Sequence, residues 1–345
     1  MKLIKYNIFM CLFMCLYMVA QAQTDPQFSQ FYNVPLYHNP ASVGTAGTRF
    51  AMTSRAQWAE VSSGMNTTLV SLDHNFGKGG SNVGGFILRD QQGKVGVVAY
   101  HVALQYGYAI KLSKTWRLRT AMEAGVINKR LENNLKFVDQ FDNSGLINPN
   151  NSEKLISESI FYPSVGAGLL LHNEVFWAGV SVNHLNRPEQ SFFAQDQLNT
   201  RVATRATIYA GARIPLFHDI NSSLSPTFLY KEQGSFKQMD LGVYAHFPIS
   251  YAFRYKHKAA SNVQGIAGVV YRGWVFEKYA HDLPNNDAIV LMAGLGFNNW
   301  GISYSFDAGI NGKDVRLNNA HEISVIYTWK KSKKRKKTFF PCPSF

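Results

Sequence analysis

A regular alternation of bulky apolar residues with small or polar residues runs through this chain from residue 48 onward. A period of two is typical of β-strands, because successive side chains of a strand point to opposite faces. Between residues 95 and 110, one parity is bulky and apolar: Val98, Tyr100, Val102, Leu104, Tyr106, Tyr108 and Ile110. The other parity is mostly small or polar: Val97, Ala99, His101, Ala103, Gln105, Gly107 and Ala109. The pattern predicts an all-β chain with one apolar face and one polar face.

Alternation of this kind fits either a soluble sandwich, whose apolar face is its core, or a membrane barrel, whose apolar face meets lipid. Three features favour the barrel. The candidate strands are long enough to span a bilayer when tilted, and Tyr, Phe and Trp recur near their ends. Arginines gather on the polar face. Charged residues make up only 17% of the chain, as expected for a surface that faces lipid.

The predicted fold is a transmembrane antiparallel β-barrel of about 14 strands, because single-chain bacterial barrels have even strand numbers. The barrel is predicted to span residues 48–330, with both chain termini on the periplasmic side of an outer membrane. Residues 131–160 break the alternation and predict a long loop. Residues 184–200 and 278–287 predict two more.

Charged residues on the polar parity predict a network inside the lumen. Its members are Arg117, Arg119, Glu123, Arg201, Arg205 and Arg213. One interpretation pairs these arginines with Glu123, Asp240 or Asp307 and so stabilises a filled barrel. The other is a positive pathway for an anionic solute. We favour the filled barrel, because loops or helices plug many such lumens.

The first residues predict a secretory signal peptide over residues 1–22. Lys2 and Lys5 precede an apolar run, and a small-residue cleavage pattern ends before Gln23. Two of the three cysteines lie inside this leader, so the mature chain keeps only Cys342 and has no intramolecular disulfide framework.

Residues 23–47 are rich in aromatic residues and prolines and lack strand alternation. Proline removes a ladder donor, so this stretch is not a central strand. We expect it to pack inside or under the barrel as a plug, and the alternative is an irregular lead-in to the first strand. The residues that define this plug or lead-in are Asp25, Pro26, Phe28, Phe31, Tyr32, Asn39 and Pro40.

The formal net charge of +13 belongs mostly to the chain ends. Seven of the 35 basic residues lie between Lys330 and Lys337, and the body of the chain is nearly balanced. A basic tail over residues 331–345 is either a solvated charge run or a periplasmic docking peptide that grips a partner or anionic lipid. Its candidate partner-binding residues are Lys330, Lys331, Lys333, Lys334, Arg335, Lys336, Lys337, Phe339, Phe340, Cys342 and Phe345. Nucleic acid is not expected as a partner of an exported chain.

Two short motifs resemble those of a known family. Residues 25–32 read Asp-Pro-Gln-Phe-Ser-Gln-Phe-Tyr and are followed by Asn39-Pro40-Ala41. Residues 55–58 read Arg-Ala-Gln-Trp. Both are similar to the mature start of the PorP/SprF proteins of type IX secretion in Bacteroidetes. The lysine-rich tail also resembles the SprF branch of that family.

The resemblance implies a non-enzymatic outer-membrane barrel without a cofactor that supports secretion or surface anchoring of a partner. Such a partner is often a large adhesin used in gliding motility, and other type IX secretion components and outer-membrane lipid are the further expected partners. The alternative is an outer-membrane channel or transporter for small or hydrophobic solutes.

Motifs of catalysis and metal binding are absent from the sequence. It has no Gly-x-Ser-x-Gly elbow, no His-Glu-x-x-His helix, no phosphate-binding loop and no Cys-x-x-Cys pair. We therefore expect no catalytic residues, no cofactor-binding residues and no metal site.

Overall fold

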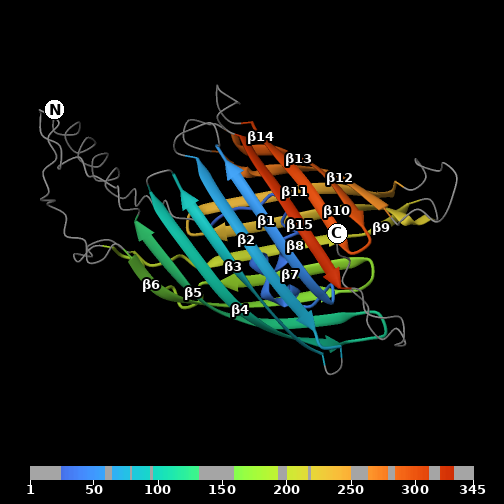
Figure 1. Cartoon of the computed structure of the whole chain (residues 1–345), viewed down its shortest axis with the longest axis horizontal. Coiled ribbons are helices and arrows are strands. Elements are labelled where there is room, and N and C mark those ends of the chain that lie inside the picture. The colour runs from blue at the N-terminus through green and yellow to red at the C-terminus, as the bar shows by residue number, and fades with distance from the viewer. Residues whose placement is uncertain are drawn as a thin grey trace, which may run out of the picture.

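The computed structural model describes residues 25–58, 64–77, 80–93, 96–131, 159–192, 200–216, 219–249, 263–278, 284–310 and 319–329. Figure 1 shows these residues as a barrel of tilted strands, seen from the side. The strands along the first half of the chain are β1 (Thr48–Gln57), β2 (Met65–Asn75), β3 (Ser81–Gln92), β4 (Val97–Lys111), β5 (Arg117–Leu131), β6 (Ser159–His172) and β7 (Phe176–Asn183). Those along the second half are β8 (Arg205–Ala212), β9 (Ile214–Leu216), β10 (Asp219–Gln233), β11 (Phe236–Pro248), β12 (Val263–Lys278), β13 (Pro284–Phe297), β14 (Trp300–Gly309) and β15 (Asn319–Trp329).

The sheet closes on itself with antiparallel neighbours. Strand β1 pairs with both β2 and β15, and β10 pairs with both β8 and β11. The short β9 also pairs with β10, beyond β8 on the same side. Strands β8 and β9 therefore act as one interrupted strand of the barrel. With β8 and β9 counted as one strand, the described strands make a closed 14-stranded barrel. The predicted fold class and strand number are confirmed.

The two faces of the wall follow the alternation of the sequence. Leu104 on β4 is 71% exposed and Met122 on β5 is 67% exposed, and both point outward. Gln105 and Glu123, their neighbours along the chain, are buried inside. This apolar-out, polar-in arrangement is that of a membrane barrel and the reverse of a soluble sandwich. None of the helices formed by the described residues has the length and hydropathy needed to span a bilayer.

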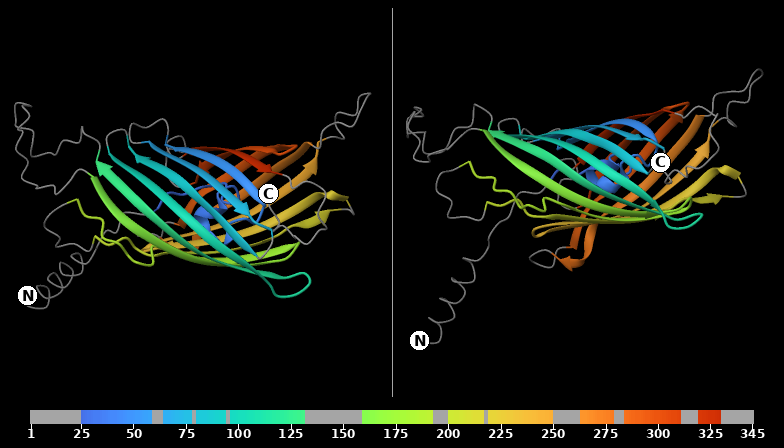
Figure 2. Two further views of the ribbon diagram at one scale, coloured as in Figure 1. Left: turned by 60° about the horizontal axis from the view of Figure 1, so that its bottom comes forward. Right: turned by 90° about the horizontal axis from the view of Figure 1, so that it is seen from below.

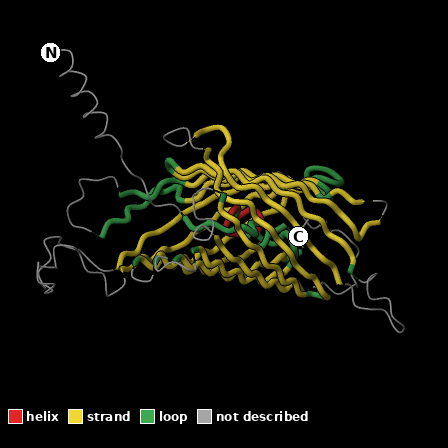
Figure 3. Tube along the Cα trace, turned by 90° about the horizontal axis from the view of Figure 1, so that it is seen from above, coloured by secondary structure: helices red, strands yellow, loops and turns green. Residues whose placement is uncertain are grey.

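The N-terminal segment (residues 25–47) lies inside the ring of strands, as Figures 2 and 3 show. It contains the short helix α2 (Pro35–His38) and the 3₁₀ turn η1 (Pro40–Ser42). Proline stands at the start of both, where its missing N–H costs nothing. The Asn39 side chain caps η1 by accepting a hydrogen bond from Ala41 N at 2.8 Å. These turns give the segment a compact shape that a strand would not have.

The barrel has two distinguishable ends. The connections 132–158 and 184–204 leave one end, which we call the long-loop end. The connections 76–80, 112–116 and 173–175 leave the other, which we call the short-turn end, although the longer connection 249–262 between β11 and β12 also leaves there. The start of β1 and the end of β15 lie together at the short-turn end, where Thr48 pairs with Trp329.

The described ends of the chain, however, lie at opposite ends of the barrel. Asp25 contacts His184 and Gln233, which lie at the long-loop ends of β7 and β10. The chain termini themselves, residues 1–24 and 330–345, lie outside the described residues, so the placement of both termini on the periplasmic side stays a prediction. An even strand number fixes only the two ends of the sheet, and here the segment before β1 doubles back through the lumen.

The boundaries of the predicted loops also differ from those in the structure. Strand β12 extends to Lys278 and β13 begins at Pro284, so half of the predicted loop at 278–287 belongs to strands, and residues 279–283 lie outside the described residues. Residues 132–158 of the first predicted loop lie outside the described residues, as do residues 1–24 and 330–345.

Candidate functional site in the barrel lumen

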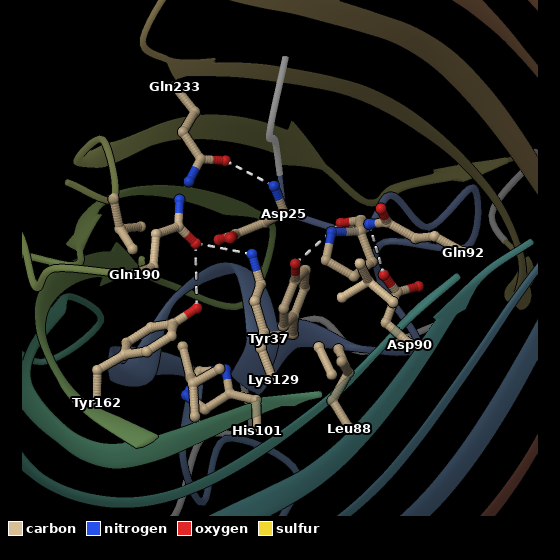
Figure 4. Close-up of a pocket in the computed structure, with 15 residues that line it drawn as sticks. Asp25, Tyr37, Leu88, Asp90, Gln92, His101, Lys129, Tyr162, Gln190 and Gln233 are labelled. Atoms are coloured by element: carbon tan, nitrogen blue, oxygen red, sulfur yellow. Dashed lines mark hydrogen bonds between the residues drawn. The ribbon is translucent and has the colours of Figure 1, made fainter. Parts of the chain in front are cut away.

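The first contact between the N-terminal segment and the wall is made by Asp25 near the long-loop end. Its carboxylate lies 2.8 Å from His184 Nε2 and 2.8 Å from an Arg205 guanidinium nitrogen. Its backbone N donates to Gln233 Oε1 at 2.8 Å, as Figure 4 shows. Burial alone would raise the pKa of the Asp25 carboxyl, but the neighbouring His184 and Arg205 hold this pKa well below its ordinary value.

Arg205 joins the start of the N-terminal segment to its helix. The guanidinium lies 4.2 Å from the centre of the Tyr37 ring and donates to the Tyr37 carbonyl at 2.8 Å. The Tyr37 hydroxyl in turn donates to the Pro26 carbonyl at 2.9 Å. Arg205 therefore makes a cation–π contact, a hydrogen bond and an ion pair with one short stretch of chain.

A buried charge network forms the second level of contact. Arg272 lies 3.2 Å from Asp240 and 2.8 Å from Asp307. Arg55 lies 2.8 Å from Asp307 and 3.4 Å from Glu322. Two guanidinium groups thus face three carboxylates, all of them buried in the lumen.

The N-terminal segment supplies the donors that this network lacks. Glu322 accepts hydrogen bonds from the backbone N–H groups of Ser29 and Gln30, at 2.7 and 2.9 Å. The Ser29 hydroxyl donates to Asp307 at 2.6 Å. A hydrogen bond to a charged group contributes about 1.5–3 kcal/mol, so the segment completes the network and stabilises buried charge.

The third level lies toward the short-turn end. Asn39 Nδ2 donates to the carbonyls of Leu169 and Val180, at 2.9 and 3.1 Å. Arg119 donates to the carbonyls of Ala41 and Val43. Gly168 allows this close approach, because a Cβ there would overlap Asn39 Oδ1.

The predicted plug residues all lie in the lumen, and the predicted network is only partly assembled there. Arg119, Glu123 and Arg205 are buried on the inner wall. Glu123 accepts hydrogen bonds from Gln105 at 2.6 Å and Asn183 at 3.1 Å. The predicted pairing of arginines with Asp240 and Asp307 is made instead by Arg55 and Arg272.

Three predicted network residues lie away from this cluster. Arg117 is half-buried at the start of β5, and Arg213 lies between β8 and β9, where its Nε donates to Ser223 Oγ at 3.0 Å. Arg201 is exposed and lies outside the barrel strands, contrary to its predicted place on a strand. Backbone hydrogen bonds from Gln190 to Thr200 and from Val202 to Pro188 hold it before β8 begins.

Sequence reasoning missed the central role of Arg55, Arg272 and Glu322. Arg55 stands in the Arg-Ala-Gln-Trp motif, whereas no motif of the sequence singles out Arg272 or Glu322. The alternation of their strands could have placed all three side chains in the lumen, because each lies on the inward-facing side of its strand. The predicted partner-binding residues of the tail lie outside the described residues.

A cavity of about 50 Å³ remains beside Asp25 at the long-loop end. It is lined by Tyr37, Asp90, His101, Lys129, Tyr162 and Gln190, among others (Figure 4). A water molecule needs about 10–15 Å³ measured in this way, so the space suits a few waters rather than a sizeable solute. The described residues contain no group of three or more His, Cys, Asp or Glu side chains that could hold a metal ion.

The fold and the lumen define a membrane β-barrel that is filled by its own N-terminal segment. The family model for the type IX secretion system membrane protein PorP/SprF matches residues 20–327. The chain therefore belongs to the PorP/SprF family, and the predicted family is confirmed. A comparison with curated proteins finds no match.

Solved barrels with similar architecture differ widely from this chain in sequence. The toluene transporter TbuX of Ralstonia pickettii is 11% identical with a TM-score of 0.45, and the match covers 85% of this chain and 92% of that one. A FadL homologue of Pseudomonas aeruginosa is 12% identical with a TM-score of 0.42, covering 84% and 92%. These values are too low for the functions of those proteins to be transferred.

Proposed function

We propose that this barrel is a non-enzymatic outer-membrane component of type IX secretion that supports export or surface anchoring of a partner protein. A large adhesin of the gliding type is the partner class that the family favours. Membership of the PorP/SprF family supports a role in this secretion system. The narrower role as an anchor for one partner is our inference.

The filled lumen is the observation that carries this proposal. The N-terminal segment is bonded to the wall at Asp25, at Ser29 and Gln30, and at Asn39, which covers most of the barrel height. A folded or extended cargo cannot share that space. The partner is therefore expected to bind the outer surface, the loops or the ends of the barrel.

Long loops of such barrels face the cell exterior and short turns face the periplasm. We therefore place the long-loop end outside and the short-turn end in the periplasm. The end of β15 then lies at the periplasmic face, and we propose that the basic tail, residues 331–345, acts there as a docking peptide for a secretion component. The start of the N-terminal segment, at Asp25, then faces the exterior.

The test combines partner capture with electrical recording. Affinity purification of the full chain from native membranes in mild detergent should recover secretion components together with a secreted surface protein. The same preparation should show no sustained conductance in planar bilayers, because the lumen is filled. A conducting protein that carries a bound hydrophobic solute and no protein partner would instead establish the solute-channel alternative.

A further inference from the structure

Two arginines stand on the outer face of the barrel near the long-loop end. Arg89 on β3 follows Ile87, which points outward and is 55% exposed, and its chain neighbours Leu88 and Asp90 are buried. Arg130 on β5 is exposed. Both therefore lie on the side of the wall that faces the membrane.

Tyr100 lies between these two arginines on the intervening strand. Arg89 is its direct partner across the β3–β4 ladder, and the Arg130 guanidinium lies 5.7 Å from the centre of its ring. Three neighbouring strands thus present two guanidinium groups around one aromatic ring, which is a compact basic surface patch.

Neither arginine has a carboxylate partner among the described residues. Arg89 donates to Gln91 Oε1 at 2.8 Å, and Arg130 contacts the Tyr100 ring. Asp90 is close in sequence, but its buried side chain points into the lumen and accepts hydrogen bonds from Thr67 and Gln92. The patch carries positive charge that no carboxylate of the described residues neutralises.

The depth of the patch follows from β4. Below Tyr100, the outward side chains of this strand are Val102, Leu104, Tyr106, Tyr108 and Ile110, and all are exposed. Lys111 then ends the strand. A strand needs about 9–11 residues to cross the apolar layer, so Tyr100 and Lys111 mark its two boundaries. The arginines lie at the level of lipid headgroups.

We propose that Arg89, Tyr100 and Arg130 bind the phosphate of an anionic lipid at the long-loop boundary of the membrane. Guanidinium groups bind phosphate oxygens in a bidentate manner. The acyl chains of the same lipid would lie on the apolar surface of Val102, Leu104 and Val126 directly below. A free phosphate ion would gain nothing from that surface, which is why we assign the site to a lipid.

The test measures binding of diphosphoryl lipid A to the purified full chain by native mass spectrometry. The variant carries both Arg89→Gln and Arg130→Gln. The control carries Lys111→Gln and Lys114→Gln, which removes the same charge from exposed positions at the short-turn end. Heat-modifiable gel mobility verifies that each variant is folded.

The double arginine variant should bind lipid A about thirtyfold more weakly, given the attraction that each basic residue contributes near an anionic surface. The lysine control should bind like the unmodified chain. Equal weakening in both variants, or equal binding of zwitterionic phosphatidylcholine, would overturn the proposal. So would displacement of lipid A by an excess of inorganic phosphate. If the double variant does not assemble, Arg130→Gln alone provides the same comparison.

Discussion

At the scale of single residues, Glu322 explains why the N-terminal segment belongs to the folded barrel. Its two carboxylate oxygens accept hydrogen bonds from two successive backbone N–H groups of Ser29 and Gln30. A buried carboxylate without such donors would be strongly destabilising. The wall and the segment therefore stabilise each other, and neither is complete alone.

Gly168 provides a test of how tightly the segment fits. Gly168→Ala would place a methyl group on Asn39 Oδ1, and Asn39 cannot rotate away without losing its hydrogen bonds to Leu169 and Val180. We expect the segment to be destabilised by about 1–3 kcal/mol, as for other overpacked sites. Limited proteolysis of residues 25–47 in the folded barrel measures the effect.

Gly296→Ala is the matched control for this substitution. A Cβ at Gly296 would find its nearest atom 3.9 Å away, which is ordinary contact. The control should leave proteolysis unchanged. Equal cleavage of the two variants would show that the contact at Gly168 does not hold the segment.

Residue parity was readable from the sequence, whereas residue partners were not. Alternation correctly placed Arg119, Glu123 and Arg205 inside the barrel. It could not show that Arg272 on β12 reaches Asp307 on β14, because this contact depends on the register and curvature of the closed sheet.

At the scale of elements, the contact between Asp25 and the wall is expected to depend on pH. Burial opposes ionisation of Asp25, but His184 and Arg205 lower its pKa well below the ordinary value of 3.8. A carboxyl with a lowered pKa stabilises the folded state above its unfolded pKa, and this contribution is lost as the pH falls. The start of the N-terminal segment should therefore loosen only in acid.

Asp25→Asn separates this effect from general acid denaturation. At neutral pH the variant should lose about 1–3 kcal/mol of protection, since it removes hydrogen bonds to a charged group. Hydrogen exchange of residues 25–38 in both proteins gives the difference at each pH. That difference should shrink as the pH falls below 3.8. A constant difference across the whole range would contradict the ionic origin of the contact.

The elements also show where the alternation pattern misleads. A helix-free barrel wall was predicted well, because period-two segments such as β4 and β5 are long and regular. The boundary of β8 was missed by four residues at Arg201, where the pattern continues but the strand has not begun. Hydrogen bonds between residues 188 and 202 compete successfully with the barrel ladder there.

At the scale of the whole molecule, the path of the chain separates its two described ends. The sheet begins and ends at the short-turn end, as the pairing of Thr48 with Trp329 requires. The N-terminal segment, which precedes β1, runs through the lumen from the long-loop end at Asp25 to the start of β1. Counting strands predicts the first fact, and only tertiary contacts of Asp25 reveal the second.

This separation leads to a topological prediction. An epitope tag placed directly before Asp25 should label from outside intact cells, while a tag placed after Trp329 should label only once the outer membrane is permeabilised. A tag in the 112–116 turn serves as a control for the short-turn end and should behave like the tag after Trp329. Labelling of both chain-end tags from one side would contradict the path of the N-terminal segment. Reversed labelling of all three tags would agree with that path but show that the barrel has the opposite orientation in the membrane. The relative placement of the two ends follows from the lumen contacts, whereas the orientation in the membrane follows from the rule that long loops face the exterior.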